Sequence, residues 1–336
     1  MTSMTKILAV FLFTAILTRL MRAYALRVNL VDVPNQRSSH KVPTPRGGGV
    51  AIVLIAVLLA LYFATEYTSS QIFFYSTAFA GLTVAAIGFV DDHGHVNAKW
   101  RLLTHFLCAA VALTFMPLPV LVFGDLTLEP NVFTFLVLTI AIVWLLNLYN
   151  FMDGIDGIAG MEAVTSLAGS ALLLYLADAP KEYIYWPLLL SAAVAGFLVV
   201  NFPPAKIFMG DAGSGFLGFS LGLLACWHST WSPNMFWSWL ILLGIFVVDA
   251  TLTLLRRILQ GKKPYEAHRS HAYQHAAVRY NSHKCVTISV ALINVFWLLP
   301  IAWLVCRSFI PGWLGLSIAY VPLVITGIWL RAGSEK

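Results

Sequence analysis

The amino-acid sequence predicts an all-α polytopic membrane protein with about eleven transmembrane helices. Composition is the first reason: 59% of the 336 residues are hydrophobic and only 11% are charged, whereas a soluble domain carries roughly 25% charged residues. The second is the recurrence of apolar runs of about 20 residues, each long enough to cross a hydrocarbon core of roughly 30 Å. Backbone polar groups in lipid must be satisfied within each segment, so we expect helices rather than the alternating strands of a β-barrel.

The predicted spans follow one another along the whole chain. In order, they cover residues 4–25, 48–66, 72–90, 101–117, 131–149, 158–177, 184–201, 214–230, 236–255, 285–306 and 312–331. The first span is too long for a signal peptide, carries Arg19 and Arg22 near its end, and is followed by no small-residue cleavage site. Because no repeat, low-complexity segment or soluble linker interrupts the pattern, residues 1–336 are predicted to form a single integral membrane domain.

Lysine and arginine residues predict the orientation. A periplasmic N-terminus and a cytoplasmic C-terminus place only Lys6, Lys181 and Arg307 outside, in agreement with the positive-inside rule. The cytoplasmic side then receives Arg27, Arg37, Lys41, Arg46, Lys99, Arg101, Lys206, Arg256, Arg257, Lys262, Lys263, Arg269, Arg279, Lys284, Arg331 and Lys336. Attraction to anionic lipid explains this charge, and so does a site for a phosphorylated substrate.

The acidic residues divide into two groups. Five of them fall in outer loops and are expected to be solvated, namely Glu66, Asp125, Glu129, Asp178 and Glu182. Five others fall in cytoplasmic loops directly beside helix ends, namely Asp91, Asp92, Asp153, Asp156 and Asp211. Since loops on a rigid scaffold commonly carry function, the sequence predicts an active site on the cytoplasmic face.

The stretch GFVDDHGHVNAKWR, residues 88–101, carries the first pair of these carboxylates. Asp91 and Asp92 end a predicted helix, where negative charge opposes the helix dipole. Paired carboxylates suit a divalent cation or a base of raised pKa. The alternative is a polar turn between two helices of a hairpin.

The stretch NFMDGIDGIAG, residues 150–160, carries the second group. Asn150, Asp153 and Asp156 are three residues apart, so on a helix they would share one face. The glycines between them would let a ligand or another backbone approach closely. A helix N-cap is the alternative reading, but it explains only one of the two aspartates.

The stretch NFPPAKIFMGDAGSGFLG, residues 201–218, places Asp211 just before a span and after two helix-breaking prolines. Gly213, Gly215 and Gly218 match the GxGxxG pattern of dinucleotide sites. That fingerprint needs a preceding strand, whereas this one lies between membrane helices, so we reject it. A glycine-rich helix N-terminus still suits an anion or phosphate.

The stretch EAHRSHAYQHAAVR, residues 266–279, spaces His268, His271 and His275 so that a helix would align them beside Arg269. Zinc is disfavoured because there is neither an HExxH motif nor a cysteine partner. A phosphate-binding stripe and a solvated amphipathic helix stay open as alternatives.

Two further features carry charge. The stretch VDVPNQRSSHKVPTPRGGG, residues 31–49, predicts a structured basic loop around Lys41 and Arg46, with lipid-headgroup anchoring as the alternative. Asp249, in FVVDATLTLLRR, lies within a predicted span, which makes it a functional candidate. A structural ion pair with Arg256, on the same helix face, is equally consistent with the sequence.

Taken in order, these motifs resemble those of the polyprenyl-phosphate N-acetylhexosamine-1-phosphate transferases, glycosyltransferase family 4. The resemblance runs from about residue 30 to residue 280 and includes every cytoplasmic motif. Members of this bacterial family start the synthesis of O-antigen, enterobacterial common antigen, teichoic acid and, in the phospho-MurNAc-pentapeptide branch, peptidoglycan. The resemblance therefore implies a Mg²⁺-dependent phosphotransferase, with Mn²⁺ as the alternative ion, in the bacterial inner membrane.

Most site residues follow from matching this sequence to the family motifs, the basic loop adds Arg46, and the histidine spacing adds His275. The catalytic group is expected to be Asp91, Asp92, Asp153, Asp156 and His271. The metal is expected on Asp211, with Asp153 or Asp92 assisting. The substrate-binding group is expected to be Lys41, Arg46, Lys99, Asn150, Asn201, Phe208, Arg269 and His275, of which Phe208 matches an aromatic residue that stacks on uracil.

The implied reaction joins a UDP-N-acetylhexosamine to undecaprenyl phosphate and releases UMP. Family members commonly show HxHH or HHH in the last loop, where this chain has His271, Ala272, Tyr273, Gln274 and His275. This variant resembles the branch that starts lipopolysaccharide O-antigen with 6-deoxy sugars such as N-acetylfucosamine or N-acetylquinovosamine. The sugar is thereby left open, with N-acetylglucosamine as a further candidate.

The expected partners are the two substrates and the lipid bilayer, without nucleic acid, and a homodimer is expected from the family alone. The alternative function is a transporter or flippase for a lipid-linked or phosphorylated substrate. A transporter would place ionisable residues near mid-membrane and paired broken helices in corresponding halves. Here the acidic residues cluster at one membrane edge, and the halves do not repeat.

Overall fold

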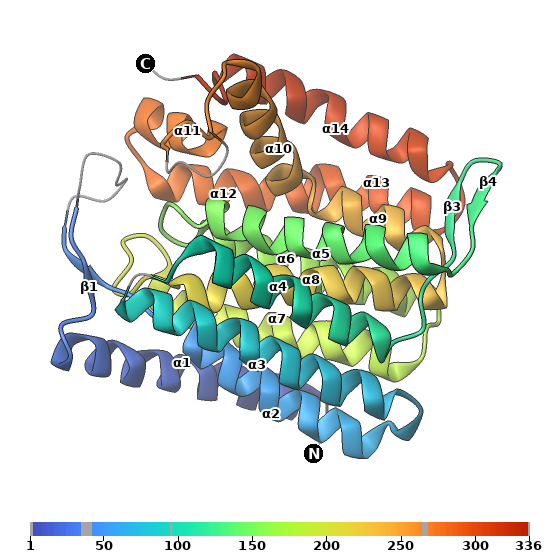
Figure 1. Cartoon of the computed structure of the whole chain (residues 1–336), viewed down its shortest axis with the longest axis horizontal. Coiled ribbons are helices and arrows are strands. Elements are labelled where there is room, and N and C mark those ends of the chain that lie inside the picture. The colour runs from blue at the N-terminus through green and yellow to red at the C-terminus, as the bar shows by residue number, and fades with distance from the viewer. Residues whose placement is uncertain (1–2, 35–41, 95, 264–267, 335–336) are drawn as a thin grey trace.

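The computed structural model describes residues 3–34, 42–94, 96–263 and 268–334. Long helices run back and forth along one direction and form a single bundle (Figure 1). Segment α1 lies along one side of this bundle and α14 along the other, with the remaining helices between them. Two short antiparallel hairpins, β1–β2 and β3–β4, are the exceptions to the predicted all-helical fold within the described ranges.

The first half of the chain alternates between the two ends of the bundle. Its elements are α1 Ser3–Arg27, β1 Val31–Asp32, β2 Thr44–Pro45, α2 Val50–Glu66, the 3₁₀ turn η1 Thr68–Ser70, α3 Gln71–His93, α4 Ala98–Thr114, β3 Leu121–Phe123, β4 Leu126–Leu128, α5 Val132–Met152 and α6 Ile158–Leu176. The second half continues with α7 Lys181–Asn201, α8 Asp211–Trp231, α9 Asn234–Leu242, α10 Gly244–Leu259, α11 Ala272–Tyr280, α12 His283–Ile293, the π-helical turn η2 Asn294–Leu298, α13 Leu299–Cys306 and α14 Gly312–Trp329.

Each predicted span coincides with one helix or with two or three consecutive helical elements, to within about four residues at either end. By length and hydropathy, seven helices in the described ranges qualify to cross a membrane, and an eighth span results if a bent pair counts as one. The prediction of a multi-pass helical membrane protein is therefore confirmed in kind. The number eleven and the orientation across the membrane stay predictions.

The span predicted at residues 236–255 is not one straight helix. It breaks between α9 and α10, whose axes differ by 71°. Gly244 begins α10, and a side chain there would lie about 3.1–3.5 Å from Tyr320, Leu323 and Leu298. The break therefore lies where neighbouring helices pack closely against the backbone, a contact that hydropathy does not register.

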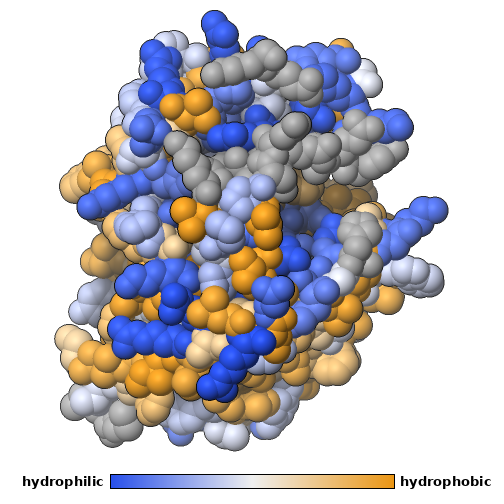
Figure 2. Space-filling model, turned by 90° about the vertical axis from the view of Figure 1, so that its left-hand side faces the viewer, coloured by the Kyte–Doolittle hydropathy of each residue, from blue (hydrophilic) through white to orange (hydrophobic). Residues whose placement is uncertain are grey.

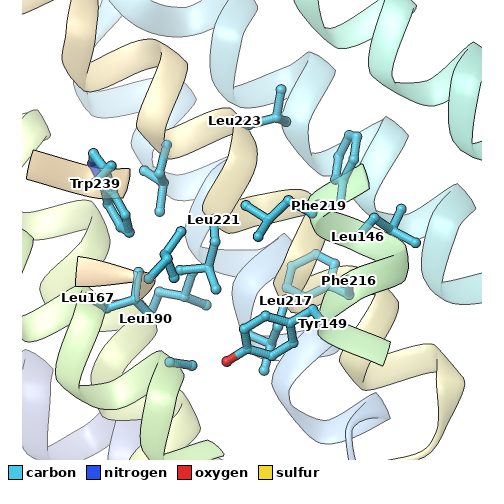
Figure 3. Packing of buried hydrophobic residues seen from close by; sticks show 14 of the residues in the cluster. Leu146, Tyr149, Leu167, Leu190, Phe216, Leu217, Phe219, Leu221, Leu223 and Trp239 are labelled. Atoms are coloured by element: carbon cyan, nitrogen blue, oxygen red, sulfur yellow. The ribbon is translucent and has the colours of Figure 1, made fainter. Parts of the chain in front are cut away.

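Helix α8 is the central element of the bundle. It packs against α2, α3, α4, α5, α6 and α9, and 17 of its 21 residues are buried, so it presents no lipid-facing side. Figure 3 shows its side chains Phe216, Leu217, Phe219, Leu221 and Leu223 among Leu146 and Tyr149 of α5, Leu167 of α6, Leu190 of α7 and Trp239 of α9. Because α8 begins at Asp211, this packing fixes the position of that carboxylate.

The glycines of the GxGxxG pattern serve helix packing. A side chain at Gly218 would meet Tyr149 Cβ at 2.7 Å and Leu146 Cα at 2.8 Å, and one at Gly213 would meet Gly49 Cα at 2.6 Å. Small residues at such crossings let membrane helices approach closely. The glycines lie within α8 and follow no strand, so the rejection of a dinucleotide fingerprint is supported by the structure.

One end of the bundle, the site end, gathers the loops that carry the sequence motifs. It holds the C-terminal ends of α3, α5 and α7, the N-terminal ends of α4 and α8, and α11, and it lies opposite the β3–β4 hairpin in Figure 1. Figure 2 looks directly at this end, where hydrophilic residues spread between apolar ones. The far end, by contrast, carries Lys6 and Arg307, the latter donating to the Leu176 carbonyl at the end of α6.

Candidate active site

Asp211 lies at the centre of the site end, in the first turn of α8. Arg101 Nη1 of α4 lies 3.0 Å from Asp211 Oδ2. Asn150 Nδ2, near the end of α5, donates to Asp211 Oδ1 at 3.0 Å and to Ser214 Oγ at 2.9 Å. The Asp211 carboxylate is therefore held by two residues that are distant in sequence, Asn150 about 60 positions before it and Arg101 about 110 positions before it.

The paired aspartates at the end of α3 have different partners. Asp91 forms an ion pair with Arg101 and accepts a hydrogen bond from the Val96 amide at 2.8 Å. Asp92 is buried, and its two carboxylate oxygens accept the backbone N–H groups of Asp211 at 3.2 Å and Ala212 at 3.4 Å. The negative charge that is unfavourable at the end of α3 thereby caps the N-terminus of α8, where it is favourable. Both residues were predicted to be catalytic, and the structure gives them different partners.

Arg46 joins this cluster from the segment before α2. Its Nη2 donates to the Asp92 carbonyl at 2.5 Å, and its Nε lies 3.8 Å from Asp92 Oδ1. The backbone of the same segment pairs with the loop before α8, since the Gly48 amide donates to the Phe208 carbonyl at 2.9 Å. Arg46 was predicted to bind substrate, and the structure places it against Asp92. Lys41 of the same predicted loop lies outside the described residues.

Asp153 and Asp156 do not share one helix face, contrary to the prediction from their spacing. Helix α5 ends at Met152 with Asp153 as its C-cap, and Asp156 lies in the turn before α6. The N-cap of α6 is Gly157, whose φ of +74° suits glycine, so neither aspartate is an N-cap. The chain turns at Gly157, and the two carboxylates have different neighbours.

Asp153 lies between the cluster around Asp211 and the cleft described below. Removal of water by the surrounding protein raises the pKa of the Asp153 carboxyl well above its usual range, and the charges of Asp211, Asp92 and Asp156 act in the same direction. The site thus carries an excess of negative charge around Asp153, which a bound cation would relieve.

Asp156 lines a cleft of about 670 Å³ at the site end. Its Oδ2 accepts the Ala205 amide at 3.0 Å, and its Oδ1 lies 3.2 Å from His283 Nδ1. The cleft is lined by Val42, Thr44, Asp156, Pro203, Pro204, Ala205, Phe208, Arg269, Ala277, Val278, Asn281, Ser282, His283 and Lys284. An aromatic ring, basic groups and a size suited to a small molecule thus meet in one concave site.

Asn201 holds the loop that contributes Phe208 to this cleft. It is buried, and its Nδ2 donates to the Ile207 carbonyl at 2.9 Å across the loop between α7 and α8. The structure therefore places Asn201 as a brace for the loop that carries Phe208, rather than at the cleft surface. Lys99 lies at the other side of the site end, exposed on the first turn of α4.

The predicted histidine stripe is not a stripe. Helix α11 begins at Ala272, so His268 lies before it and His271 is its N-cap. His271 is buried, and its Nδ1 lies 3.4 Å from Asp249 Oδ1, whereas His275 lies one turn further along α11. Arg269 lines the cleft beside Phe208. The prediction failed because the carboxylate of Asp249, on another helix, decides where α11 begins.

A narrow groove of about 200 Å³ extends from Asp211 toward the apolar part of the bundle. Its lining residues are Val84, Gly88, Ala98, Arg101, Leu102, His105, Leu146, Asn147, Asn150, Phe151, Asp211 and Gly215. One end is thus bounded by Asp211, Arg101 and Asn150, and the rest is mostly apolar. Such a groove can accommodate an amphipathic molecule with its polar head beside Asp211.

Arg101 is the functional residue that the sequence reading undervalued. It was assigned only to the basic cytoplasmic side, yet it bridges Asp91 and Asp211. A usable signal was available, since Arg101 lies one turn into a helix that follows Asp91 by a short loop. Its second partner, Asp211, lies 110 positions away and leaves no local pattern.

The residues around Asp211 can be compared with the ligands that Mg²⁺, the ion implied by the resemblance, takes in proteins. Among the residues described, no three His, Cys, Asp or Glu side chains converge as metal ligands. Mg²⁺ commonly takes one or two carboxylates and completes its shell with water and phosphate oxygens. Asp211 keeps 34% of its side chain exposed, whereas Asp92 keeps 1%. Asp211 is therefore the more accessible of these two carboxylates, whereas Asp92 is occupied by the backbone of α8.

Part of the chain matches a known protein family. Residues 74–229, from α3 to α8, match the model of the glycosyl transferase family 4. The chain is 28% identical to a probable undecaprenyl-phosphate N-acetylglucosaminyl 1-phosphate transferase of Bacillus subtilis, over 93% of this chain and 87% of that protein. It is 29% identical to the decaprenyl-phosphate N-acetylglucosaminephosphotransferase of Mycolicibacterium smegmatis, over 84% and 77%.

A third relative covers nearly the whole chain. The undecaprenyl-phosphate alpha-N-acetylglucosaminyl 1-phosphate transferase of Yersinia pestis is 27% identical over 98% of this chain and 92% of that protein. The similarity therefore extends over the described bundle, beyond the matched family segment.

Proposed function

We propose that this chain, whose residues 74–229 match the model of the glycosyl transferase family 4, is a member of that family and transfers an N-acetylhexosamine 1-phosphate from a UDP-sugar to undecaprenyl phosphate. One observation carries the proposal: Asp211, held by Arg101 and Asn150, lies at the polar end of a mostly apolar groove. The cleft lined by Asp156, Phe208 and Arg269 opens at the same end of the bundle. A lipid phosphate and a soluble nucleotide can meet only at such a boundary.

The donor is assigned to the cleft. Phe208 offers a ring on which a base can stack, and Arg269 offers a guanidinium suited to phosphate oxygens. The relatives named above act, by their names, on N-acetylglucosamine phosphate carried to a polyprenyl phosphate, which supports a donor of this class.

The acceptor is assigned to the apolar groove. Its polar end would hold the phosphate beside Arg101, and its apolar lining suits an isoprenoid chain. A phosphate with a second pKa of about 6 is already largely ionised at neutral pH. Asp91, which is bound to Arg101, is therefore assigned to orient this guanidinium rather than to remove a proton.

In the proposed reaction, an oxygen of the lipid phosphate attacks the β-phosphorus of the UDP-sugar. A new phosphorus–oxygen bond forms, the bond between the β-phosphorus and the bridging oxygen breaks, and UMP leaves with that oxygen and its electron pair. Arg101 and Arg269 would hold the two anions in line, which supplies most of what such a transfer requires. Mg²⁺, with Mn²⁺ as the alternative, would neutralise charge on the diphosphate and on the leaving UMP, and Asp211 would hold the ion together with Asp153.

The finer assignments belong to the same proposal. The site end faces the cytoplasm of a bacterial inner membrane, the product is undecaprenyl-diphospho-N-acetylhexosamine, and the step initiates O-antigen synthesis. The sugar is a 6-deoxy N-acetylhexosamine or N-acetylglucosamine, and the protein acts as a homodimer.

UMP release from purified protein in detergent tests this function. We expect release that requires undecaprenyl phosphate and Mg²⁺, stops with EDTA, and is fastest with one of UDP-GlcNAc, UDP-FucNAc and UDP-QuiNAc. Release without the lipid would indicate hydrolysis and would contradict the transferase. Binding of all three donors without release of UMP would also contradict it.

A further inference from the structure

Asp249 is a buried carboxylate that the proposed reaction does not use. It lies in α10, and its oxygens face α11 instead of Arg256, whose Nη1 donates to the Ala332 carbonyl. Asp249 Oδ1 accepts the Ala272 amide at 2.8 Å, and Oδ2 accepts the Tyr273 amide at 2.9 Å. Both donors belong to the first turn of α11, where backbone N–H groups have no partner within the helix.

The same carboxylate holds the ring of His271, whose Nδ1 lies 3.4 Å from Asp249 Oδ1. Asp249 therefore caps α11 from a different helix and fixes its N-cap residue at the same time. A buried charge is tolerated only when it is paired and hydrogen-bonded. These three contacts meet that condition and lock the start of α11 to the membrane helix α10.

Tyr273 extends this connection to the last turn of α5. Its hydroxyl donates to the Phe151 carbonyl at 3.0 Å, and its ring stacks against that of His271 with centroids 5.6 Å apart. A side chain at Gly154 would collide with the Tyr273 hydroxyl. Tyr273 thus rests directly on the residues between Asn150, which holds Asp211, and Asp153.

We propose that Asp249 and Tyr273 are positioning residues, which together set the place of the C-terminal end of α5, from Asn150 to the C-cap Asp153, relative to Asp211. The carboxylate orients the first turn of α11, and the tyrosine hydroxyl transmits that orientation to the Phe151 carbonyl. Neither residue touches substrate. This inference rests on the proposed function, because it assigns the end of α5 a role in that reaction.

Removal of one oxygen atom tests the link. Tyr273→Phe deletes only the hydroxyl, and Tyr320→Phe is the matched control, because the Tyr320 hydroxyl donates to the Leu240 carbonyl at 2.7 Å between α14 and α9. We expect kcat to fall about tenfold in Tyr273→Phe, with the donor KM nearly unchanged. We expect the control to keep the wild-type kcat and both variants to show similar melting temperatures.

A mutant cycle with Asp249→Asn tests whether the two residues act as one connection. Asp249→Asn should lower kcat by more than Tyr273→Phe does, because it frees the whole first turn of α11. Adding Tyr273→Phe to it should then cost little more, whereas Asp249→Glu, which keeps the charge, should recover part of the activity. Fully additive losses would overturn the connection.

Hydrogen exchange supplies a readout that does not depend on activity. We expect faster amide exchange over residues 150–157 in Tyr273→Phe than in wild type or in the Tyr320→Phe control. Wild-type exchange in that segment, or wild-type kcat, would overturn the positioning role. If wild-type protein releases no UMP, the proposed function fails, and the exchange rates alone decide the positioning role.

Discussion

The two ends of the helix bundle are closed by different chemistry. At the site end, ion pairs and side-chain hydrogen bonds join segments far apart in sequence, such as Arg101 to Asp211 at 3.0 Å. At the far end, the β3–β4 hairpin packs on α9 through rings, with Phe123 and Trp237 centroids 5.2 Å apart. There, Trp237 Nε1 also donates to the Val122 carbonyl at 2.8 Å.

This difference suggests that the far end mainly stabilises the bundle, whereas the site end serves function. Ring packing at the far end buries apolar surface and does not depend on charged groups. The site end gathers Asp91, Asp92, Asp153 and Asp211 around few cations, which costs desolvation and repulsion but prepares the site for anions and a cation. Mutations at the site end should therefore change rates, and those at the far end should change melting temperatures.

The largest expected effect comes from Asp211→Asn. The amide keeps the shape but removes the charge that Arg101 and the proposed cation require, so kcat for UMP release should fall about 10³-fold. Asp125→Asn, on the exposed turn of the far-end hairpin, is the charge-matched control and should retain full activity. Equal activity of the two variants would contradict the assignment of catalysis to the site end.

A smaller loss is expected from Arg101→Gln. The substitution leaves Asp91 and Asp211 facing each other without the guanidinium between them, so kcat should fall about 10²-fold. The matched control is Arg307→Gln at the far end, where the guanidinium donates only to the Leu176 carbonyl at 2.9 Å. Steady-state kinetics in detergent would compare them, and an unchanged kcat in Arg101→Gln would contradict its bridging role.

Arg269→Gln should act on binding rather than on the chemical step. Arg269 lines the cleft assigned to the donor, so its loss should raise the donor KM about tenfold with little change in kcat. Arg279→Gln serves as the control, because its guanidinium lies 4.0 Å from the centre of the Trp329 ring. A fall in kcat at constant KM would contradict a role in donor binding and would indicate that Arg269 acts on the reacting groups.

The smallest expected effect lies at the far end. Trp237→Phe keeps an aromatic ring but removes the donor to the Val122 carbonyl, which is worth about 1 kcal/mol. The melting temperature should fall by about 1–3 °C, and kcat should be unchanged. A measurable loss of kcat would show that the two ends are coupled through the bundle.

Sequence reasoning succeeded where the signal is local and failed where partners are distant. Apolar runs marked every long helix, because burial in lipid requires about 20 such residues in succession. The motifs around Asp91, Asn150 and Asp211 were correctly grouped at one end of the bundle. The capping of α8 by Asp92 was missed, since its donors lie 119 and 120 positions away. The start of α11 was missed for the same reason, because Asp249 sets it from α10.

The central position of α8 has a consequence for how the protein is made. This helix is absent from those that qualify by length and hydropathy to cross a membrane alone, although it forms the middle of the described bundle. A newly made α8 that leaves the translocation channel alone would be poorly stabilised by lipid until α2 to α6 pack around it. We therefore expect α8 to enter the bilayer late and with assistance, so that Asp211 reaches its place only after the earlier helices have assembled.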